Sequence, residues 1–395
     1  MSRCRVLGLL SGTSVDAIDV AAAEFHLVGD VLDLTPLGAL TVPHPGGLRE
    51  EVLAALPPGP CSARRLCELD TRLGLAFAEA AARGLAELAD GRADLVASLG
   101  QTVYHWVEDG RCLGTLQLGQ AAWIAEATGL PVVADLRARD VAAGGQGAPL
   151  VALLDDLWLR DHAPAVAVNL GGIANITVVR PEEETLAYDT GPANALLDAA
   201  CRWLSGGSAT RDTDGVMAAA GSVRADLLDR LLADPYYALP PPKSTGKERF
   251  HLDHVHAALA GLPPVRDVDL LATLTELTAV TVADACHRHG ARLVVASGGG
   301  VRNPVLLRAL RRRLAGVDLR VSDALGLPAD AKEAYLAAML GFLTWHGLPG
   351  NLPSATGADG PRVLGSITPG RRTPRQPSPA THAPRRLRLT PPTGR

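Results

Sequence analysis

The sequence is poor in aromatic side chains, which make up only 4% of its 395 residues. The hydrophobic share of 47% therefore comes mainly from Ala, Leu and Val, in the proportion expected of a packed globular protein. So few aromatic rings argue against a nucleic-acid stacking platform. The net charge of −4 gives no basic field that would attract phosphate backbones or anionic lipid. We expect no nucleic-acid partner and no membrane partner.

Long apolar runs and clustered cysteines are also missing. The N-terminal run VLGLL is too short for the core of a signal peptide, and no stretch approaches the roughly 20 apolar residues that span a bilayer. The six cysteines include no CxxC pair and no Cys/His cluster. This pattern argues against a disulfide framework or a structural metal site. We expect a cytoplasmic protein with reduced thiols.

The pattern of the chain predicts two related α/β domains. Short buried strands alternate with alanine-rich helices, which are expected near 62–90, 119–128, 193–204, 223–233 and 267–289. The segments LGLLSGTSVDAIDVAAAEF and VAVNLGGIANITVV lie about 160 residues apart, and each reads as a strand, a small polar turn and a second strand. We therefore expect two similar domains, each of which presents a hairpin turn to a shared cleft.

The expected boundaries follow from these two units. We place the first domain at 1–135 with a returning segment at 346–370, and the second at 136–345. Residues 371–395 contain seven arginines, six prolines and no acidic residue, which is typical of a disordered tail. A compositional accident and an anionic partner are both open explanations of this tail.

Three glycine-rich turns follow predicted strands. In SGTSVD at 11–16, backbone N–H groups and hydroxyls are suited to cradling phosphate oxygens, and Asp16 to holding Mg²⁺. NLGGIAN at 169–175 has the same character, and SGGG at 297–300 leads into a helix N-terminus. Ordinary tight turns would explain each one equally well. Because neither GxGxxG nor a P-loop is present, an ATP-using enzyme must have another architecture.

Several polar side chains are candidates for chemistry. Asp189 in DTGPAN could cap the helix that follows, or act as a general base at the mouth of a cleft. The loop expected at 100–102 carries hydrogen-bonding groups that suit a sugar, whereas His105 is more typical of a structural histidine. Arg137 lies near the expected domain junction, in a hinge or a substrate loop. Glu333 is either a cleft carboxylate or an exposed helix residue.

Taken in order, these motifs resemble the anhydro-N-acetylmuramic acid kinases of bacterial cell-wall recycling. The resemblance runs from about residue 6 to 370 and is carried by SGTSVDAIDV, GQTVYH, LQLGQAAWIAEATGLPVVADLRARDVAAGGQGAPLV, NLGGIANIT, DTGPANALLD, PPKSTGKERF, DLLATLTELTA and GGGVRNP. It implies the two-domain actin-like ATPase fold, a duplicated ribonuclease H-like α/β fold, with the active site in the interdomain cleft. The cofactors it implies are ATP and Mg²⁺, and the substrate is a small anhydro-amino-sugar.

The resemblance also implies residue roles. Asp189 is expected to take a proton from the water that attacks the anomeric carbon, after which O6 of the sugar attacks the γ-phosphate. The residues expected to bind ATP are Gly12, Thr13, Ser14, Val15, Asp16, Ala17, Ile18 and Asp19, with Asn169, Gly171 and Gly172, and with Gly298, Gly299 and Gly300 at the adenosine end. Those expected near the sugar are Gly100, Gln101, Thr102, Arg137 and Glu333. Asp16 is the expected metal ligand.

Two positions depart from the family pattern, because this chain has alanine at 17 and 193 where glycine is usual. Two other readings of the function stay open. The first is a sugar kinase of the same superfamily that acts on a reducing hexosamine and needs no hydrolytic water. The second is a non-catalytic ATP-dependent switch, since actin-like folds also support filaments and chaperones. A homodimer is also open.

Overall fold

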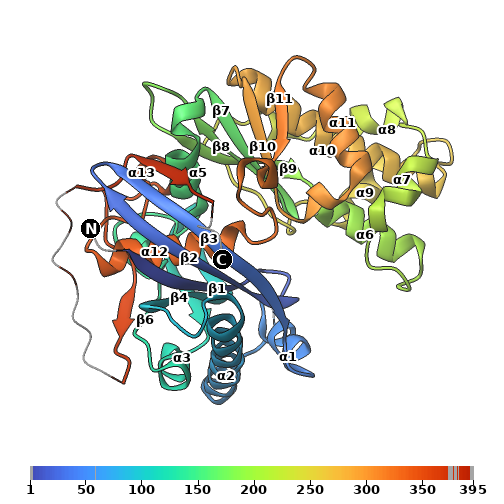
Figure 1. The fold of residues 1–395 in the computed structure, drawn as a ribbon. Coiled ribbons are helices and arrows are strands. Elements are labelled where there is room, and N and C mark those ends of the chain that lie inside the picture. Colours follow the sequence, from blue (N-terminus) through green and yellow to red (C-terminus); the bar gives the residue numbers. More distant parts are fainter. Residues whose placement is uncertain (1–2, 58, 372–376, 378–379, 381, 392–395) are drawn as a thin grey trace. The chain divides into compact units, whose positions relative to one another are not determined.

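The computed structural model describes residues 3–57, 59–371, 377, 380 and 382–391. The chain divides into two compact units, both visible in Figure 1. Unit 1 comprises residues 1–158 and 331–395, and unit 2 comprises residues 159–330.

Unit 1 is built on a mixed sheet. Its path runs in the order β12-β6-β4-β1-β2-β3-β13, and β5 pairs with β4 as a hairpin. The first three strands pair antiparallel, whereas β4 joins parallel to β1 and β6 joins parallel to β4. The strands are β1 (Cys4–Ser11), β2 (Ala17–Val28), β3 (Val31–Pro43), β4 (Leu95–Glu108), β5 (Arg111–Leu118), β6 (Val132–Ala134), β12 (Ser366–Thr368) and β13 (Arg386–Leu389).

Helices cover both faces of this sheet, so β1 is buried on both sides. Leu7 lies 3.6 Å from the position that a Cβ on Gly84 of α2 would take, and a Cβ on Gly8 would overlap the carbonyl of Ala334 in α12. Successive strand residues point to opposite faces, so α2 and α12 pack on opposite sides of the sheet. The helices of unit 1 are α1 (Leu48–Ala55), α2 (Ala63–Leu88), α3 (Ala121–Thr128), α4 (Ala138–Ala142), α5 (Val151–Leu159), α12 (Lys332–Trp345) and α13 (Pro353–Thr356).

Unit 2 repeats the central topology of unit 1. Its sheet has the order β9-β8-β7-β10-β11, in which the first three strands in sequence pair antiparallel and the last two join parallel. The strands are β7 (Ala165–Leu170), β8 (Ile173–Val179), β9 (Leu186–Pro192), β10 (Leu293–Ser297) and β11 (Asp318–Val321). The expected duplication of a strand–turn–strand unit is confirmed, and with it the two-domain α/β class.

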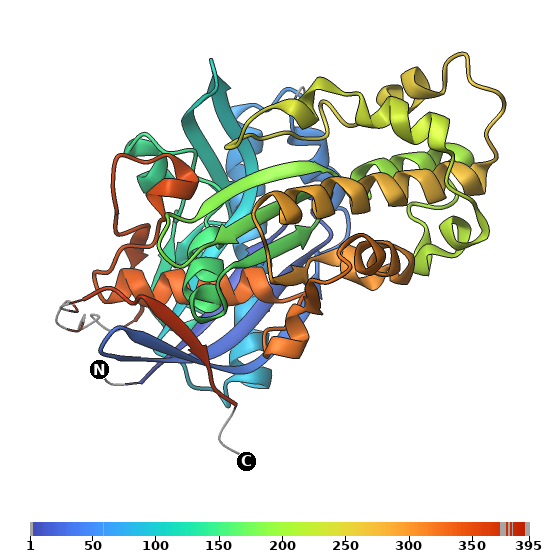
Figure 2. The same ribbon diagram turned by 90° about the horizontal axis from the view of Figure 1, so that it is seen from above.

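A long buried helix, α10, organises the rest of unit 2, and Figure 2 shows it as the long gold helix of this unit. Its first half, including Leu270 and Leu274, packs in an apolar cluster with α6, α8 and α9, and its second half, including Ala279 and Val282, packs on the sheet. The helices are α6 (Asn194–Leu204), α7 (Val216–Ala220), α8 (Ala225–Leu232), α9 (Leu252–Leu259), α10 (Asp267–Arg288) and α11 (Pro304–Arg313). Short 3₁₀ turns occupy Arg160–His162, Thr213–Gly215, Pro235–Ala238, Gly299–Arg302 and Ser322–Leu325. All five helices expected from the pattern are present within a few residues.

The boundaries of the units differ from the expected 1–135 with 346–370 and 136–345. The segment after residue 135 belongs to unit 1 because the buried Asp140 carboxylate accepts hydrogen bonds from Asn351 Nδ2 and Thr356 Oγ1, both at 2.8 Å. Helix α12 belongs to unit 1 because it packs directly on β1. These contacts join residues more than 200 positions apart in sequence, so no local pattern predicts them.

Two local expectations are also corrected. Residues 100–102 do not form a loop, because β4 continues through them to Glu108 and pairs with β5. Within the expected disordered tail, 371–395, residues Arg386–Leu389 form β13 along the edge of β3. Arg388 lies 2.6 Å from the Asp33 carboxylate, and the Leu387 side chain is buried. Residues 372–376, 378–379, 381 and 392–395 of that tail lie outside the described residues.

Candidate active site

The first glycine turn connects β1 to β2 in unit 1. Val15 has a positive φ of 55° and a side chain in the core, and its N–H donates to the Gly12 carbonyl at 3.0 Å. This anchor leaves Thr13, Ser14 and Asp16 exposed at the tip of the turn. The turn therefore presents two hydroxyls and one carboxylate to solvent, as the predicted phosphate site requires.

The end of the expected ATP segment lies in β2 and has other contacts. Ile18 is fully buried, and the Asp19 carboxylate accepts a hydrogen bond from Thr41 Oγ1 at 2.7 Å. Ala17 pairs with Pro43 in the β2–β3 ladder. In this structure the side chain of Ile18 belongs to the core rather than to the exposed tip of the turn.

An arginine that the sequence patterns did not single out lies beside this turn. Arg49, at the start of α1, donates to Asp16 Oδ1 at 3.1 Å and to the Ser14 carbonyl at 3.3 Å. His44 Nε2 lies 3.1 Å from Ser11 Oγ, and burial, followed by the positive charge of Arg49, lowers the pKa of this imidazole. The turn is therefore bordered by a permanent cation.

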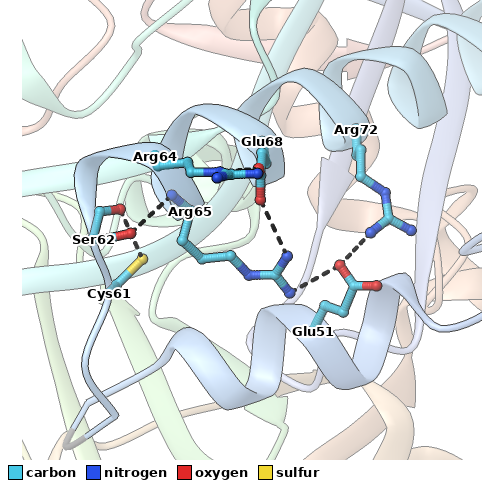
Figure 3. Close-up of polar contacts among 7 residues, drawn as sticks. All are labelled: Glu51, Cys61, Ser62, Arg64, Arg65, Glu68 and Arg72. Carbon is cyan, nitrogen blue, oxygen red and sulfur yellow. Dashed lines mark hydrogen bonds and ion pairs between the residues drawn. The ribbon is translucent and has the colours of Figure 1, made fainter.

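The position of Arg49 depends on how α1 is fixed to α2 (Figure 3). Figure 3 shows the Glu51 carboxylate between two guanidinium groups of α2; Arg65 lies 2.9 Å away, and Arg72 also contacts it. Ser62 caps α2 by accepting from the Arg65 backbone N–H at 3.1 Å. Because Arg49 and Glu51 belong to the same short helix, these ion pairs hold the helix that carries Arg49.

The predicted sugar residues of β4 are tied to the same turn. A Cβ on Gly100, where φ is 63°, would lie 2.7 Å from the Leu118 carbonyl, so glycine is required there. The fully buried Gln101 donates through Nε2 to the Gly12 carbonyl at 3.2 Å. Thr102, the next residue, keeps a partly exposed side chain. Gln101 thus links the predicted phosphate turn to the predicted sugar strand.

Arg137 is held by a hydrogen-bond network in unit 1, and its charge acts on Glu333. Arg137 donates to the Gly147 carbonyl at 2.9 Å, and the Gly147 N–H donates to Asp140 Oδ2 at 2.8 Å. Glu333 keeps an exposed surface, yet desolvation by the surrounding protein raises the pKa of its carboxyl. Arg137 and Lys332 oppose that shift, while Asp19 adds to it. The positive charge of Arg137 therefore acts on the carboxyl of the predicted Glu333.

In unit 2, the second and third glycine turns meet. Gly298 follows β10 with φ 83°, and a Cβ on it would overlap Oδ1 of Asn169 at the end of β7. Asn194 Nδ2 bridges the carbonyls of Leu170 and Gly171 at 3.0 and 2.8 Å. The predicted nucleotide residues of these turns, Asn169, Gly171, Gly172, Gly298, Gly299 and Gly300, therefore lie close together in this unit, and Gly300 is buried against Leu170.

Asp189 lies in the middle of β9 and is not a helix cap. Helix α6 begins at Asn194, and its N-cap position is Ala193, which makes no side-chain capping bond. The helix-cap explanation of Asp189 is wrong, because four residues separate it from the first turn of α6.

The loop 239–248 packs against the Asp189 backbone and carboxylate. The Asp189 N–H donates to the Lys243 carbonyl at 3.0 Å, and its own carbonyl accepts from Tyr236 Oη at 2.7 Å. Asp189 Oδ2 accepts from the Thr245 N–H at 2.9 Å. Further along the loop, Lys247 lies against Gly172, where its Cε would be 3.4 Å from an added Cβ. The loop that contains the PPKSTGKERF motif thus connects Asp189 to a glycine turn.

The surroundings of Asp189 shift the pKa of its carboxyl in the direction that suits a general base. Burial raises the pKa of Asp189 to about 6; the hydrogen bond from Thr245 opposes the shift, and the charge of Glu248 adds to it. Among the described residues, Oδ1 has no hydrogen-bond partner. A carboxylate of this kind is mostly ionised at neutral pH and binds a proton more tightly than an ordinary aspartate, as suits a general base.

Two features are absent from the described residues. No group of three or more His, Cys, Asp and Glu side chains among them is arranged to hold a metal ion. None of the helices they form combines the length and apolar character needed to cross a bilayer. Arg49 and Tyr236 were missed by the sequence patterns, since neither belongs to a glycine turn or to a strand end.

Two α/β units of matching central topology, each with glycine turns beside polar side chains, form the duplicated two-domain fold of the actin-like class. Within that class, this chain belongs to the anhydro-N-acetylmuramic acid kinase family, whose model matches residues 4–370. It is 60% identical over 387 residues to the anhydro-N-acetylmuramic acid kinase of Streptomyces coelicolor, covering 98% of this chain and 99% of the relative. It is 52% identical over 393 residues to that of Rhodococcus erythropolis, covering 98% and 99%. A solved xylulose kinase from Rhodospirillum rubrum aligns with a TM-score of 0.42 at 14% identity, over 85% of this chain and 90% of that one.

Proposed function

We propose that this chain is an ATP-dependent kinase that opens the 1,6-anhydro ring of 1,6-anhydro-N-acetylmuramic acid with water and phosphorylates O6. The products are N-acetylmuramic acid 6-phosphate and ADP. The observation that carries this proposal is the state of Asp189, which has one oxygen fixed by Thr245 and a pKa raised to about 6. Membership of the family supports the same reaction.

Asp189 acts as the general base of the ring opening. Its Oδ1 takes a proton from a water molecule while the water oxygen attacks C1 of the sugar. The C1–O6 bond breaks and its electron pair stays on O6, which attacks the γ-phosphorus of ATP as ADP leaves. A positioned base of this kind contributes about 10²–10⁴-fold to the rate. The Tyr236 and Lys243 contacts hold the Asp189 backbone in place for this step.

The exposed tip of the turn at 12–16 is the proposed site of the ATP phosphates. Backbone N–H groups and the hydroxyls of Thr13 and Ser14 supply donors, and Arg49 supplies a fixed positive charge beside them. Asp16 is the proposed ligand of Mg²⁺. One carboxylate fits this ion, which takes its other ligands from phosphate and water. When bound, Mg²⁺ neutralises charge on the phosphates.

The sugar is proposed to lie against Thr102, Arg137 and Glu333 of unit 1. Arg137 Nε is buried and has no partner in the described part of the chain, and a buried donor without a partner is costly unless a ligand satisfies it. Glu333 offers acceptor oxygens with a pKa raised by desolvation. Together these groups supply both donors and acceptors, as an amino sugar requires.

The decisive experiment follows the products of wild type and Asp189→Asn with 1,6-anhydro-N-acetylmuramic acid and Mg-ATP in ¹⁸O-labelled water. We expect wild type to release ADP and to form the 6-phosphate with one labelled oxygen at C1, and the variant to lose about 10²-fold or more in kcat. ADP formation with a reducing hexosamine alone would favour another sugar kinase. If Asp189→Asn were fully active, Asp189 would not be the general base.

The cellular setting follows from the substrate. An anhydro-amino-sugar arises from cell-wall breakdown, so we place the enzyme in peptidoglycan recycling in the cytoplasm, where ATP is available. Fractionation of cells that express the tagged chain tests the location. A homodimer stays a prediction that light scattering of the purified protein would decide.

A further inference from the structure

One face of the β4–β5 hairpin carries a row of hydrogen-bonded polar side chains. The register pairs Thr102 with Gln117 and His105 with Thr115, and residues that face each other across a ladder lie on the same side of it. Gln117 Nε2 donates to Thr115 Oγ1 at 2.7 Å and to Thr102 Oγ1 at 3.3 Å. Thr115 Oγ1 lies 3.0 Å from His105 Nδ1. We call these four residues the hairpin row.

The hydrogen bonds of the hairpin row have a definite direction. The Gln117 amide uses both of its N–H groups on the two threonines, which therefore accept. In the tautomer of His105 that leaves Nδ1 without a proton, Thr115 donates its single proton to Nδ1. This fits a neutral imidazole, because burial, with the nearby Arg137 charge, lowers the pKa of His105. The row thus begins at a neutral histidine and ends at the Thr102 hydroxyl.

The direction of the row decides what Thr102 offers to a ligand. A hydroxyl has one proton to donate and two lone pairs that accept. Because a lone pair of Thr102 is engaged by Gln117, the Thr102 proton is left to point away from the row. Gln117 Oε1 is buried and has no partner among the residues that the structure describes. A buried oxygen without a partner lowers stability, so a contribution to hairpin stability does not by itself explain a glutamine at this position.

The hairpin row lies beside the proposed sugar site. Helix α4, which follows Arg137, packs on β5, and the Arg137 guanidinium acts electrostatically on His105. We propose that Gln117 is a sugar-positioning residue: its amide fixes the Thr102 hydroxyl as a hydrogen-bond donor toward an acceptor oxygen of the anhydro-amino-sugar. This inference deepens the proposed function and rests on it. Gln117 acts through Thr102 and takes no part in the phosphoryl transfer.

The test is a double-mutant cycle in which KM for the sugar, KM for ATP and kcat are measured. Gln117→Met keeps the length of the side chain and removes its amide, whereas Thr102→Val removes the hydroxyl. Each single variant should raise KM for the anhydro sugar about tenfold, the cost of one polar contact, with KM for ATP unchanged. In the Thr102→Val background, Gln117→Met should add less than about threefold, because the hydroxyl that it orients is already gone.

A second variant guards against loss of folding. Gln117→Glu retains the shape of the side chain, but the introduced carboxylate can only accept from the two threonines. Thr102 would then donate its proton to this carboxylate rather than to the sugar. We expect a larger rise in KM for the sugar than with methionine, again without a change for ATP. The matched control is Gln120→Met, since the exposed Gln120 carboxamide lies at the N-terminus of α3, where its Oε1 accepts from the Ala122 N–H. This control should leave both KM values unchanged.

The outcomes separate the inference from the proposed function. If wild type forms no 6-phosphate from the anhydro sugar, the proposed function fails before any variant is compared. If wild type is active but the effects of Gln117→Met and Thr102→Val multiply in full, Gln117 does not act through Thr102 and the inference is overturned. Equal rises in KM for sugar and ATP would also overturn it, because they would indicate a general loss of structure.

Discussion

At the residue scale, the titration of Asp189 is set by a small number of neighbours. Burial raises the pKa of its carboxyl to about 6, the Thr245 N–H opposes the rise, and Glu248 adds to it. The base form of Asp189 is the ionised one. Activity that depends on it is present above the pKa and lost as the pH falls through it.

The first prediction concerns the acid side of the pH profile. The kcat/KM of wild type should fall below about pH 6 with the slope of a single protonation. Glu248→Gln removes a negative charge that raises the pKa of Asp189, so the acid limb should move to lower pH. Initial rates across pH 4.5–8.5, an assay range of about four units, would detect the movement. Glu182→Gln, an exposed change in the same unit, should leave the limb in place.

At the scale of the element, the glycine turns differ in what their glycines do. Gly298 has φ 83°, and a Cβ there would overlap Asn169 Oδ1, so its glycine is required by the fold. Gly299, the next residue, has open space around the position of a Cβ. The same turn therefore contains a glycine with a structural reason and one without.

The second prediction uses this pair. Gly298→Ala should lower the free energy of unfolding by about 1–3 kcal/mol, because it combines backbone strain with a steric clash. Gly299→Ala should leave stability within about 0.5 kcal/mol of wild type. If the turn contacts the nucleotide closely, Gly299→Ala should nevertheless raise KM for ATP. Urea denaturation and ATP titration separate the two effects; equal stability losses would contradict the structural reading of the turn.

At the scale of the whole molecule, unit 1 is assembled from two distant parts of the chain. Helix α12 inserts against β1, and the buried Lys332 Nζ lies 2.5 Å from Asp155 Oδ1 of α5. Both side chains are almost fully buried, with 4% and 3% of their surface exposed. A buried ion pair is costly to break, because removing one partner leaves the other charge buried and unpaired.

The third prediction is that Lys332→Met destabilises the protein by about 3–5 kcal/mol. Replacing both partners, as in Lys332→Met with Asp155→Leu, should recover much of that loss, since two apolar side chains of similar size fit a buried position. Chemical denaturation measures each free energy of unfolding. Arg311→Met on the exposed side of α11 serves as the control and should change stability by less than about 0.5 kcal/mol.

The fourth prediction concerns the C-terminal strand. Removing residues 384–395 deletes β13 and exposes the edge of β3, which then presents unpaired backbone groups. The truncated protein should keep its kinetic constants but aggregate more readily on heating, as light scattering would show. Truncation after Thr390 retains β13 and the hydrogen bond between the hydroxyls of Thr390 and Thr35. This variant should behave as the full chain does. Loss of kcat in the first variant alone would mean that β13 has a role beyond covering the edge.

The sequence alone determined the elements that depend on local pattern. Alternating hydrophobic strands, long apolar helices and glycine turns were predictable because periodicity and backbone torsion act over a few residues. The duplication of the strand–turn–strand unit followed from the same signals. The family and the candidate residues Asp189, Asp16 and Thr102 were identified from ordered motifs.

Only the tertiary structure decided which groups meet. The hydrogen bond from Thr245 to Asp189 joins residues 56 positions apart, and that from Asn351 to Asp140 joins residues 211 apart. Pairing of β13 with β3 and of Gln117 with Thr102 depends equally on how strands are brought into register. Such contacts depend on the path of the intervening chain rather than on the residues next to them. For this reason the pattern of the sequence predicted the glycine turns and singled out Asp189, but it did not show which loop contacts Asp189, or that Arg49 and the Gln117 amide lie beside the predicted site residues.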